Sequence, residues 1–224
     1  MFHVKHSLPS KTFAEFSGEL RSLTSSALTQ AQLRRLYAHY EELARWIPTT
    51  SLIGPGTMAV ALERHYAESL AALELIDTPP RNLVDVGSGA GFPGFVLGAM
   101  LGSTQTFLVE AKQKKWAFLM AAARHARLDL VCLHARVSDS LPRELPDEVD
   151  LLTLRALRLP TAAWRALLKR LPESGRVFLW AAARSAAGAD SAGFEALGLE
   201  PIRELGIRGS KYRKIIVLKH IEES

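Results

Sequence analysis

A glycine-rich segment near the middle of the chain carries the residues with the clearest chemical use. Gly87, Gly89 and Gly91 alternate with other residues shortly after Asp85, and Phe92 follows them directly. Glycines at this spacing let the backbone approach a bound nucleotide closely and offer it N–H groups. The dinucleotide fingerprint G-x-G-x-x-G requires glycine where this chain has Phe92. The pattern therefore indicates a nucleotide-binding loop and argues against an NAD(P)-dependent dehydrogenase.

A carboxylate, Glu110, stands about twenty residues beyond the glycines, at the end of the next predicted strand. At that position a carboxylate can accept hydrogen bonds from two ribose hydroxyls, which supports a nucleoside ligand. A structural alternative is that Glu110 caps the helix predicted to begin at Lys112.

The secondary structure that positions these residues is predicted from two parts of the chain with different hydrophobic patterns. Residues 1–79 are predicted to form an N-terminal helical extension, because apolar residues recur every three or four positions up to Ile76. Thr29 and Gln32 have the spacing of a helix-capping box. Residues 80–224 are predicted to form the nucleotide-binding domain.

Short β-rich runs alternate with helical runs from Asn82 onward. The predicted strands are 83–86, 106–109, 130–133, 149–154, 176–180 and 214–218, and the predicted helices are 92–101, 112–126, 161–171 and 191–197. This alternation is typical of an α/β fold with a doubly wound, mostly parallel sheet. The loop after Asp85 and the end of the next strand, at Glu110, are then expected at the same edge of the sheet.

Composition narrows the class of protein. The 224 residues are 48% hydrophobic and include one Cys, Cys132, which excludes an internal disulfide framework and a Cys-rich zinc module. No metal site is expected. No apolar run reaches the roughly 20 residues of a membrane-spanning helix, and residues 1–10 lack the apolar core of a secretory signal. We therefore expect a cytoplasmic protein without membrane association.

Positive charge is concentrated in the second half of the chain. The net charge is +5, from 28 Lys and Arg against 23 Asp and Glu. Residues 113–224 hold 19 of the basic and 13 of the acidic side chains, and Glu204 is the only acidic residue between 203 and 219. Such a cluster suits a polyanionic partner, and the alternative is a solvated surface without a partner.

With its Phe92-Pro93-Gly94 ending, the glycine-rich loop resembles that of Rossmann-like S-adenosylmethionine-dependent methyltransferases. More specifically, it is similar to the bacterial small-subunit ribosomal RNA methyltransferase G family, also called glucose-inhibited division protein B. The resemblance extends over about residues 30 to 219. It rests also on three other segments, Arg64-His65-Tyr-Ala-Glu68-Ser69-Leu70, Lys114-Lys115-Trp-Ala-Phe118-Leu119 and Arg155-Ala156.

The resemblance implies methyl transfer from S-adenosylmethionine to N7 of a guanine in the decoding-region loop of small-subunit (16S) ribosomal RNA. The cofactor contacts that it implies are Asp85, Gly87, Gly89, Gly91, Phe92, Glu110, Val137, Ser138 and Arg155. The expected RNA contacts are Arg64, His65, Lys114, Lys115, Arg208, Lys211, Arg213 and Lys214. Guanine N7 carries a free lone pair, so no acid–base residue is expected. The partner would be ribosomal RNA or the small ribosomal subunit, and a monomer is expected.

The chain departs from the family pattern at three places. Ser51-Leu52-Ile53 stands where the family has Asn-Leu-Thr, Trp180-Ala181-Ala182 where it has Leu-Lys-Gly, and Ser138 where it has Glu. Two alternative enzymes are a methyltransferase for protein or small molecules, which would not need the C-terminal basic cluster, and a dehydrogenase, against which Phe92 argues. The departures at Ile53 and Ala181 add a third alternative, a non-catalytic RNA-binding or ribosome assembly factor. Binding of S-adenosylmethionine without turnover would favour the last.

Overall fold

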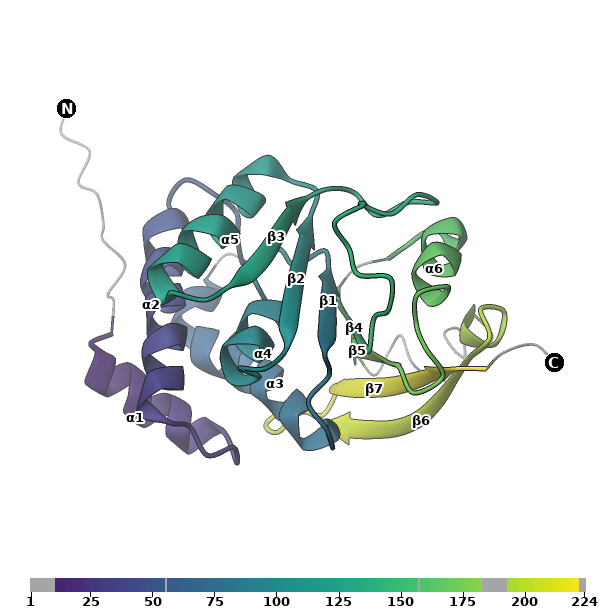
Figure 1. Ribbon diagram of the computed structural model, residues 1–224. Helices are drawn as coiled ribbons and strands as arrows, with labels where there is room; N and C mark the ends of the chain where they lie inside the picture. The colour runs from purple at the N-terminus through teal and green to yellow at the C-terminus, as the bar shows by residue number, and fades with distance from the viewer. Residues whose placement is uncertain (1–10, 55, 157, 183–192, 222–224) are drawn as a thin grey trace.

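The computed structural model describes residues 11–54, 56–156, 158–182 and 193–221 (Figure 1). Between Phe13 and Leu75 the regular elements are helical. They are α1 (Phe13–Leu23), α2 (Gln30–Trp46), the 3₁₀ turn η1 (Thr57–Val60), the π-helical segment η2 (Leu62–Ala67), α3 (Glu68–Leu70) and the 3₁₀ turn η3 (Ala71–Leu75). The predicted capping box of Thr29 and Gln32 opens α2, and Thr12 with Glu15 opens α1 in the same way.

The remaining residues form a seven-stranded sheet with helices. Its strands are β1 (Asn82–Val86), β2 (Gln105–Glu110), β3 (Leu130–His134), β4 (Leu151–Arg155), β5 (Arg176–Ala182), β6 (Leu199–Gly206) and β7 (Arg213–His220). The strand order is β3-β2-β1-β4-β5-β7-β6. Strands β1 to β5 pair in parallel, and β7 is antiparallel to both β5 and β6. The predicted doubly wound, mostly parallel sheet is confirmed.

The helices between the strands are α4 (Gly94–Met100), α5 (Gln113–Ala126) and α6 (Thr161–Leu168). The sequence placed the start of α4 two residues too early and the end of α6 three residues too late. It missed β6 altogether, because most side chains of this strand are exposed and give no apolar alternation. Of the helix predicted over 191–197, residues 193–195 are helical, and 191 and 192 lie outside the described residues.

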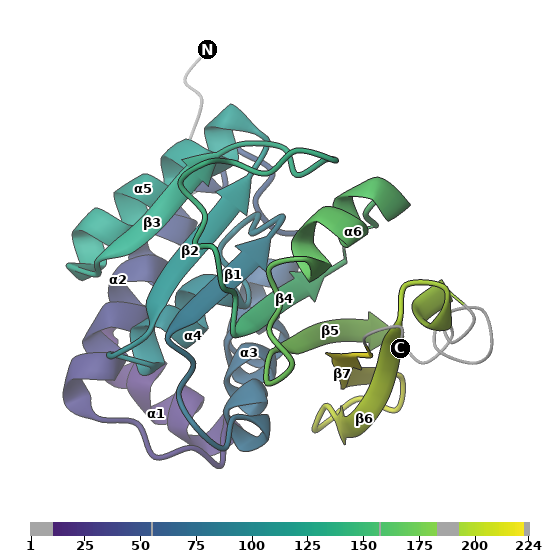
Figure 2. The same cartoon turned by 45° about the vertical axis from the view of Figure 1, so that its right-hand side comes forward.

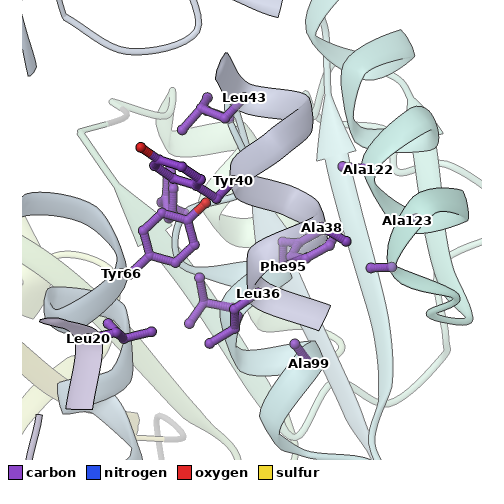
Figure 3. Packing of buried hydrophobic residues seen from close by; sticks show 14 of the residues in the cluster. Leu20, Leu36, Ala38, Tyr40, Leu43, Tyr66, Phe95, Ala99, Ala122 and Ala123 are labelled. Carbon is purple, nitrogen blue, oxygen red and sulfur yellow. The ribbon is translucent and has the colours of Figure 1, made fainter. Parts of the chain in front are cut away.

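Two apolar layers cover the faces of the sheet. On one face α1, α2, α4 and α5 pack together, and α6 lies on the other (Figures 1 and 2). The larger cluster of the first layer joins Phe16 and Leu33 to Phe95 and Phe118, so the N-terminal helices share their core with the sheet domain. Figure 3 shows the centre of this cluster, where Tyr40 and Tyr66 lie beside each other.

Within the part of the chain that the structure describes, no helix is both long and apolar enough to cross a membrane.

Candidate functional site

The glycine-rich loop joins the end of β1 to α4. Gly87, Gly89 and Gly91 have φ angles of 73°, 56° and 83°, in the left-handed region that favours glycine. A Cβ atom on Gly91 would lie 2.8 Å from the Cβ atom of Phe95 and 3.1 Å from Nε2 of His39. The loop therefore requires glycine for its backbone conformation and for its close packing.

Asp85 lies directly beneath this loop and is almost completely buried. Its Oδ1 atom accepts a hydrogen bond of 2.7 Å from the hydroxyl of Thr153, its neighbour on β4. Its Oδ2 atom is buried and has no hydrogen-bond partner among the described residues. Burial raises the pKa of Asp85 to about 6. A buried carboxylate oxygen without a partner is suited to a cationic or N–H-donating group of a ligand.

Gly94 explains how α4 comes so close to Asp85. A Cβ atom at this position would overlap the Asp85 side chain and lie 2.6 Å from Cδ2 of Leu108. The helix therefore packs directly on β1 and β2, which brings its N-terminal end to the loop.

Glu110 ends β2 beside the loop, as the sequence predicted. Its Oε2 atom accepts a hydrogen bond of 2.8 Å from the N–H group of Gly89. Its Oε1 atom accepts one of 2.7 Å from the N–H group of Lys112, at the start of α5. The carboxylate thus binds the N–H group of the N-cap residue of α5 and also an N–H group of the nucleotide loop. Each oxygen keeps a second lone pair, so binding of ribose hydroxyls stays a prediction compatible with this geometry.

Val137 and Ser138 follow β3 at the same edge of the sheet. Val137 is buried in the apolar layer that contains α6. Ser138 is half-buried, and its hydroxyl lies 3.3 Å from the hydroxyl of Ser140. In this geometry the Val137 side chain is part of the core, and Ser138 offers its backbone and hydroxyl.

A buried ion-pair network lies at the end of β4. Arg155 donates from Nη2 to Oε2 of Glu68 at 2.8 Å and to the carbonyl oxygen of Arg64 at 2.7 Å. Arg213, on β7, forms an ion pair with the other oxygen of Glu68. Burial lowers the pKa of Arg155 to about 10, so its guanidinium stays charged at neutral pH. Glu68, which is only 3% exposed, thereby joins α3, β4 and β7.

The predicted RNA-binding residues fall into separate groups. Lys114 is exposed on the first turn of α5, and Lys115 reaches the loop, with its Nζ atom 4.0 Å from where a Cβ atom of Gly89 would lie. Arg208 and Lys211 are exposed in the turn between β6 and β7.

Two further predicted RNA contacts form ion pairs with carboxylates of the protein itself. Lys214 pairs with Glu204 at 2.6 Å, and Arg213 is held by the buried Glu68. The C-terminal cluster is therefore less cationic than its sequence, because β6 and α3 supply carboxylates from other parts of the chain.

Two important residues escaped the sequence analysis as functional groups. His39, on α2, is completely buried, and its Nε2 atom lies 2.9 Å from the carbonyl oxygen of Ala90 in the loop. The available signal was a polar residue on the apolar face of a helix, four positions before Leu43. Glu68 belongs to one of the segments that resemble the family, but the sequence does not predict its ion pairs with Arg155 and Arg213.

The described residues contain no group of three or more His, Cys, Asp or Glu side chains that could hold a metal ion. The site consists of a loop with three left-handed glycines, the carboxylates of Asp85 and Glu110, and the ion-pair network of Arg155, Arg213 and Glu68. Such an arrangement can bind and orient a nucleoside ligand and bring a polyanion to it.

Comparison with known proteins agrees with this geometry. A sequence model of the family described as "rRNA small subunit methyltransferase G" matches residues 32–196. A ribosomal RNA small subunit methyltransferase G from Rhodospirillum rubrum is 39% identical over 157 residues, which cover 70% of this chain and 72% of the relative. The one from Paramagnetospirillum magneticum is 36% identical over 135 residues, which cover 60% of this chain and 63% of the relative.

Solved structures share the fold. A SAM-dependent methyltransferase from Aquifex aeolicus superposes with a TM-score of 0.58 at 17% identity, covering 72% of this chain and 93% of that one. TrmN from Thermus thermophilus gives a TM-score of 0.52 at 22% identity, covering 71% and 53%. The fold is thus that of the Rossmann-like methyltransferases that use S-adenosylmethionine, as the glycine-rich loop predicted. Together with the match over residues 32–196, these findings show that the chain belongs to the rRNA small subunit methyltransferase G family.

Proposed function

We propose that this protein transfers a methyl group from S-adenosylmethionine to N7 of a guanine in the decoding-region loop of small-subunit ribosomal RNA. The observation that carries the proposal is the buried Asp85 with its unpartnered oxygen, directly beneath a loop of three left-handed glycines. Family membership supports the reaction and the class of substrate.

The residues around the loop have distinct roles in this proposal. Asp85 and the glycines hold the methionine part of the cofactor, and Glu110 holds the ribose. Backbone of Val137 and Ser138 borders the adenine. A Cβ atom on Gly89 would have no neighbour closer than 3.7 Å, so the cofactor can lie against the backbone at this position.

The cofactor supplies a methyl group on a positively charged sulfur. The carbon–sulfur bond breaks as the bond from carbon to guanine N7 forms, and no proton is transferred. The protein therefore needs no general base. Its contribution is to align the guanine with the methyl group and to exclude water, which is worth several kcal/mol in well-oriented reactions.

Basic side chains flank the site and form the proposed RNA surface. Lys114 and Lys115 lie beside the loop, Arg64 is exposed on η2, and Arg208 and Lys211 extend from the β6–β7 turn. A ribosomal substrate also places the protein in the cytoplasm, and this location is part of the proposal.

The test is methyl transfer from radiolabelled S-adenosylmethionine to small ribosomal subunits that lack the modification. Mass spectrometry of the labelled RNA identifies the nucleoside, and we expect N7-methylguanosine at a single site. Glu110→Ala serves as the cofactor-site control and should weaken S-adenosylmethionine binding in calorimetry. Cofactor binding without label on subunits or free RNA would refute the catalytic proposal and favour a non-catalytic RNA-binding factor.

A further inference from the structure

His65 is a half-buried polar side chain to which the proposed cofactor site assigns no role. It lies in the π-helical segment η2. π-Helical turns are rare in proteins, and those that occur are often found at functional sites. Its Nε2 atom is buried and has no hydrogen-bond partner among the described residues. Since buried polar atoms in folded proteins are nearly always paired, this nitrogen marks a place where a ligand atom can bind.

The ring of His65 is held against the cofactor loop. It stacks on Phe92, with ring centroids 4.9 Å apart and planes inclined by 22°. Phe92 directly follows Gly91, the last glycine of the loop. His65 therefore stands at the boundary between the proposed cofactor site and the RNA-facing residues.

Arg155 borders the same space. Its Nη2 atom donates a hydrogen bond to the carbonyl oxygen of Arg64, the residue before His65. Its Nη1 atom is buried and has no hydrogen-bond partner among the described residues. This place is at the carboxyl ends of β1 and β4, where ligands bind in open α/β sheets. His65 on η2 and Arg155 on β4 thus each carry a buried nitrogen atom without a hydrogen-bond partner among the described residues.

The charge state of His65 defines what it can do. Burial, and to a smaller extent the positive charges of Arg155, Arg64 and Arg213, lower its pKa to about 4. At neutral pH the imidazole is therefore uncharged and carries one N–H group. It can donate a hydrogen bond without adding positive charge beside a sulfonium methyl donor.

The acceptor base needs such a donor. Guanine presents two acceptors on one edge, N7 and O6. The N7 lone pair must remain free to attack the methyl group, so a positioning hydrogen bond must go to O6. His65 has no proton to remove from N7 and is not needed as a base.

From this geometry we propose that His65, stacked on Phe92, binds the acceptor guanine by donating a hydrogen bond from Nε2 to O6. This inference rests on the proposed function and adds the residue that orients the base. As the methyl group moves, positive charge passes from sulfur to the guanine ring, and the proton on His65 stays in place.

The test combines protein and substrate variants. His65→Phe keeps an aromatic ring on Phe92 and removes the donor, whereas His65→Gln keeps a donor. The substrates are RNAs with either guanine or 2-aminopurine at the mapped target position, because 2-aminopurine keeps N7 and lacks O6. Calorimetric binding of S-adenosylmethionine to each variant controls for the fold and the cofactor site.

On guanine RNA we expect His65→Phe to lower kcat about tenfold, the scale of one lost hydrogen bond, with cofactor affinity unchanged. His65→Gln should recover part of this loss. On 2-aminopurine RNA, the wild type and His65→Phe should turn over at the same rate. An equal loss on both RNAs, or no loss on guanine RNA, would overturn the role of His65 and leave the proposed function standing. Wild-type protein that methylates neither RNA would overturn both.

Discussion

A buried hydrogen-bond chain connects the N-terminal helices to the cofactor loop and allows a quantitative prediction. His39 Nε2 lies 2.9 Å from the carbonyl oxygen of Ala90, and its Nδ1 lies 2.6 Å from the hydroxyl of Tyr66. The carbonyl can only accept, so Nε2 must carry the hydrogen and Nδ1 must accept from the Tyr66 hydroxyl. Burial lowers the pKa of His39 to about 3, which agrees with this neutral form.

The substitution Tyr66→Phe removes the hydroxyl donor and leaves Nδ1 of His39 buried without a hydrogen-bond partner. An unsatisfied buried acceptor costs about 1–3 kcal/mol. In a protein of this size each kcal/mol shifts the melting temperature by about 2–4 °C. We therefore expect a loss of about 2 kcal/mol in the free energy of unfolding and a Tm lower by about 4–8 °C.

Tyr40→Phe is the matched control. Tyr40 is buried in the same cluster (Figure 3). Among the described residues, its hydroxyl accepts only a long hydrogen bond of 3.5 Å from the N–H group of Lys11. Its loss should cost about 0.5 kcal/mol or less, because surrounding packing is kept. Urea unfolding of both variants, with unchanged m-values, measures the difference. Equal destabilisation by the two substitutions would refute the assigned hydrogen-bond chain.

Three other perturbations test the site. Asp85 has a folded pKa of about 6, above its ordinary 3.8, so its contribution to stability is most favourable at low pH and is lost as the pH rises through 6. If its charged form binds the cofactor, calorimetric affinity for S-adenosylmethionine should fall below pH 6 in the wild type. Glu68→Gln should lower the free energy of unfolding by about 3–5 kcal/mol in urea titrations, because it leaves two partly buried arginines without their shared carboxylate. Replacing Lys114 and Lys115 by Glu should weaken RNA binding and flatten its dependence on salt concentration, measured by filter binding.

Each of these three predictions has a result that would contradict it. An affinity for S-adenosylmethionine that does not change between pH 5 and 8 would show that Asp85 does not bind the cofactor. Asp85→Asn is the control, because its side chain does not titrate. A Glu68→Gln protein as stable as the wild type would mean that the ion pairs contribute nothing net. An unchanged salt slope would show that the two lysines face solvent without touching RNA.

Local sequence determined much of the fold and the core of the site. Glycines at alternate positions after Asp85 predicted the loop, because only glycine adopts its left-handed conformations without strain. The β–α alternation predicted the parallel sheet and therefore the meeting of the loop with Glu110 at one edge. The capping box at Thr29 predicted the start of α2, since it depends only on residues three positions apart.

Tertiary structure decided the remainder. Most residues of strand β6 are exposed whether they are apolar, such as Ile202, or charged, such as Glu204, and its antiparallel pairing with β7 makes it a strand. Glu68 and Arg155 are 87 residues apart, and their ion pair exists because the strand order brings the end of β4 beside η2 and α3. The unpartnered nitrogen of His65 likewise depends on how η2 packs on Phe92. Periodicity and spacing report neighbours along the chain, whereas burial and charge pairing at this site arise from elements that meet only when the sheet is assembled.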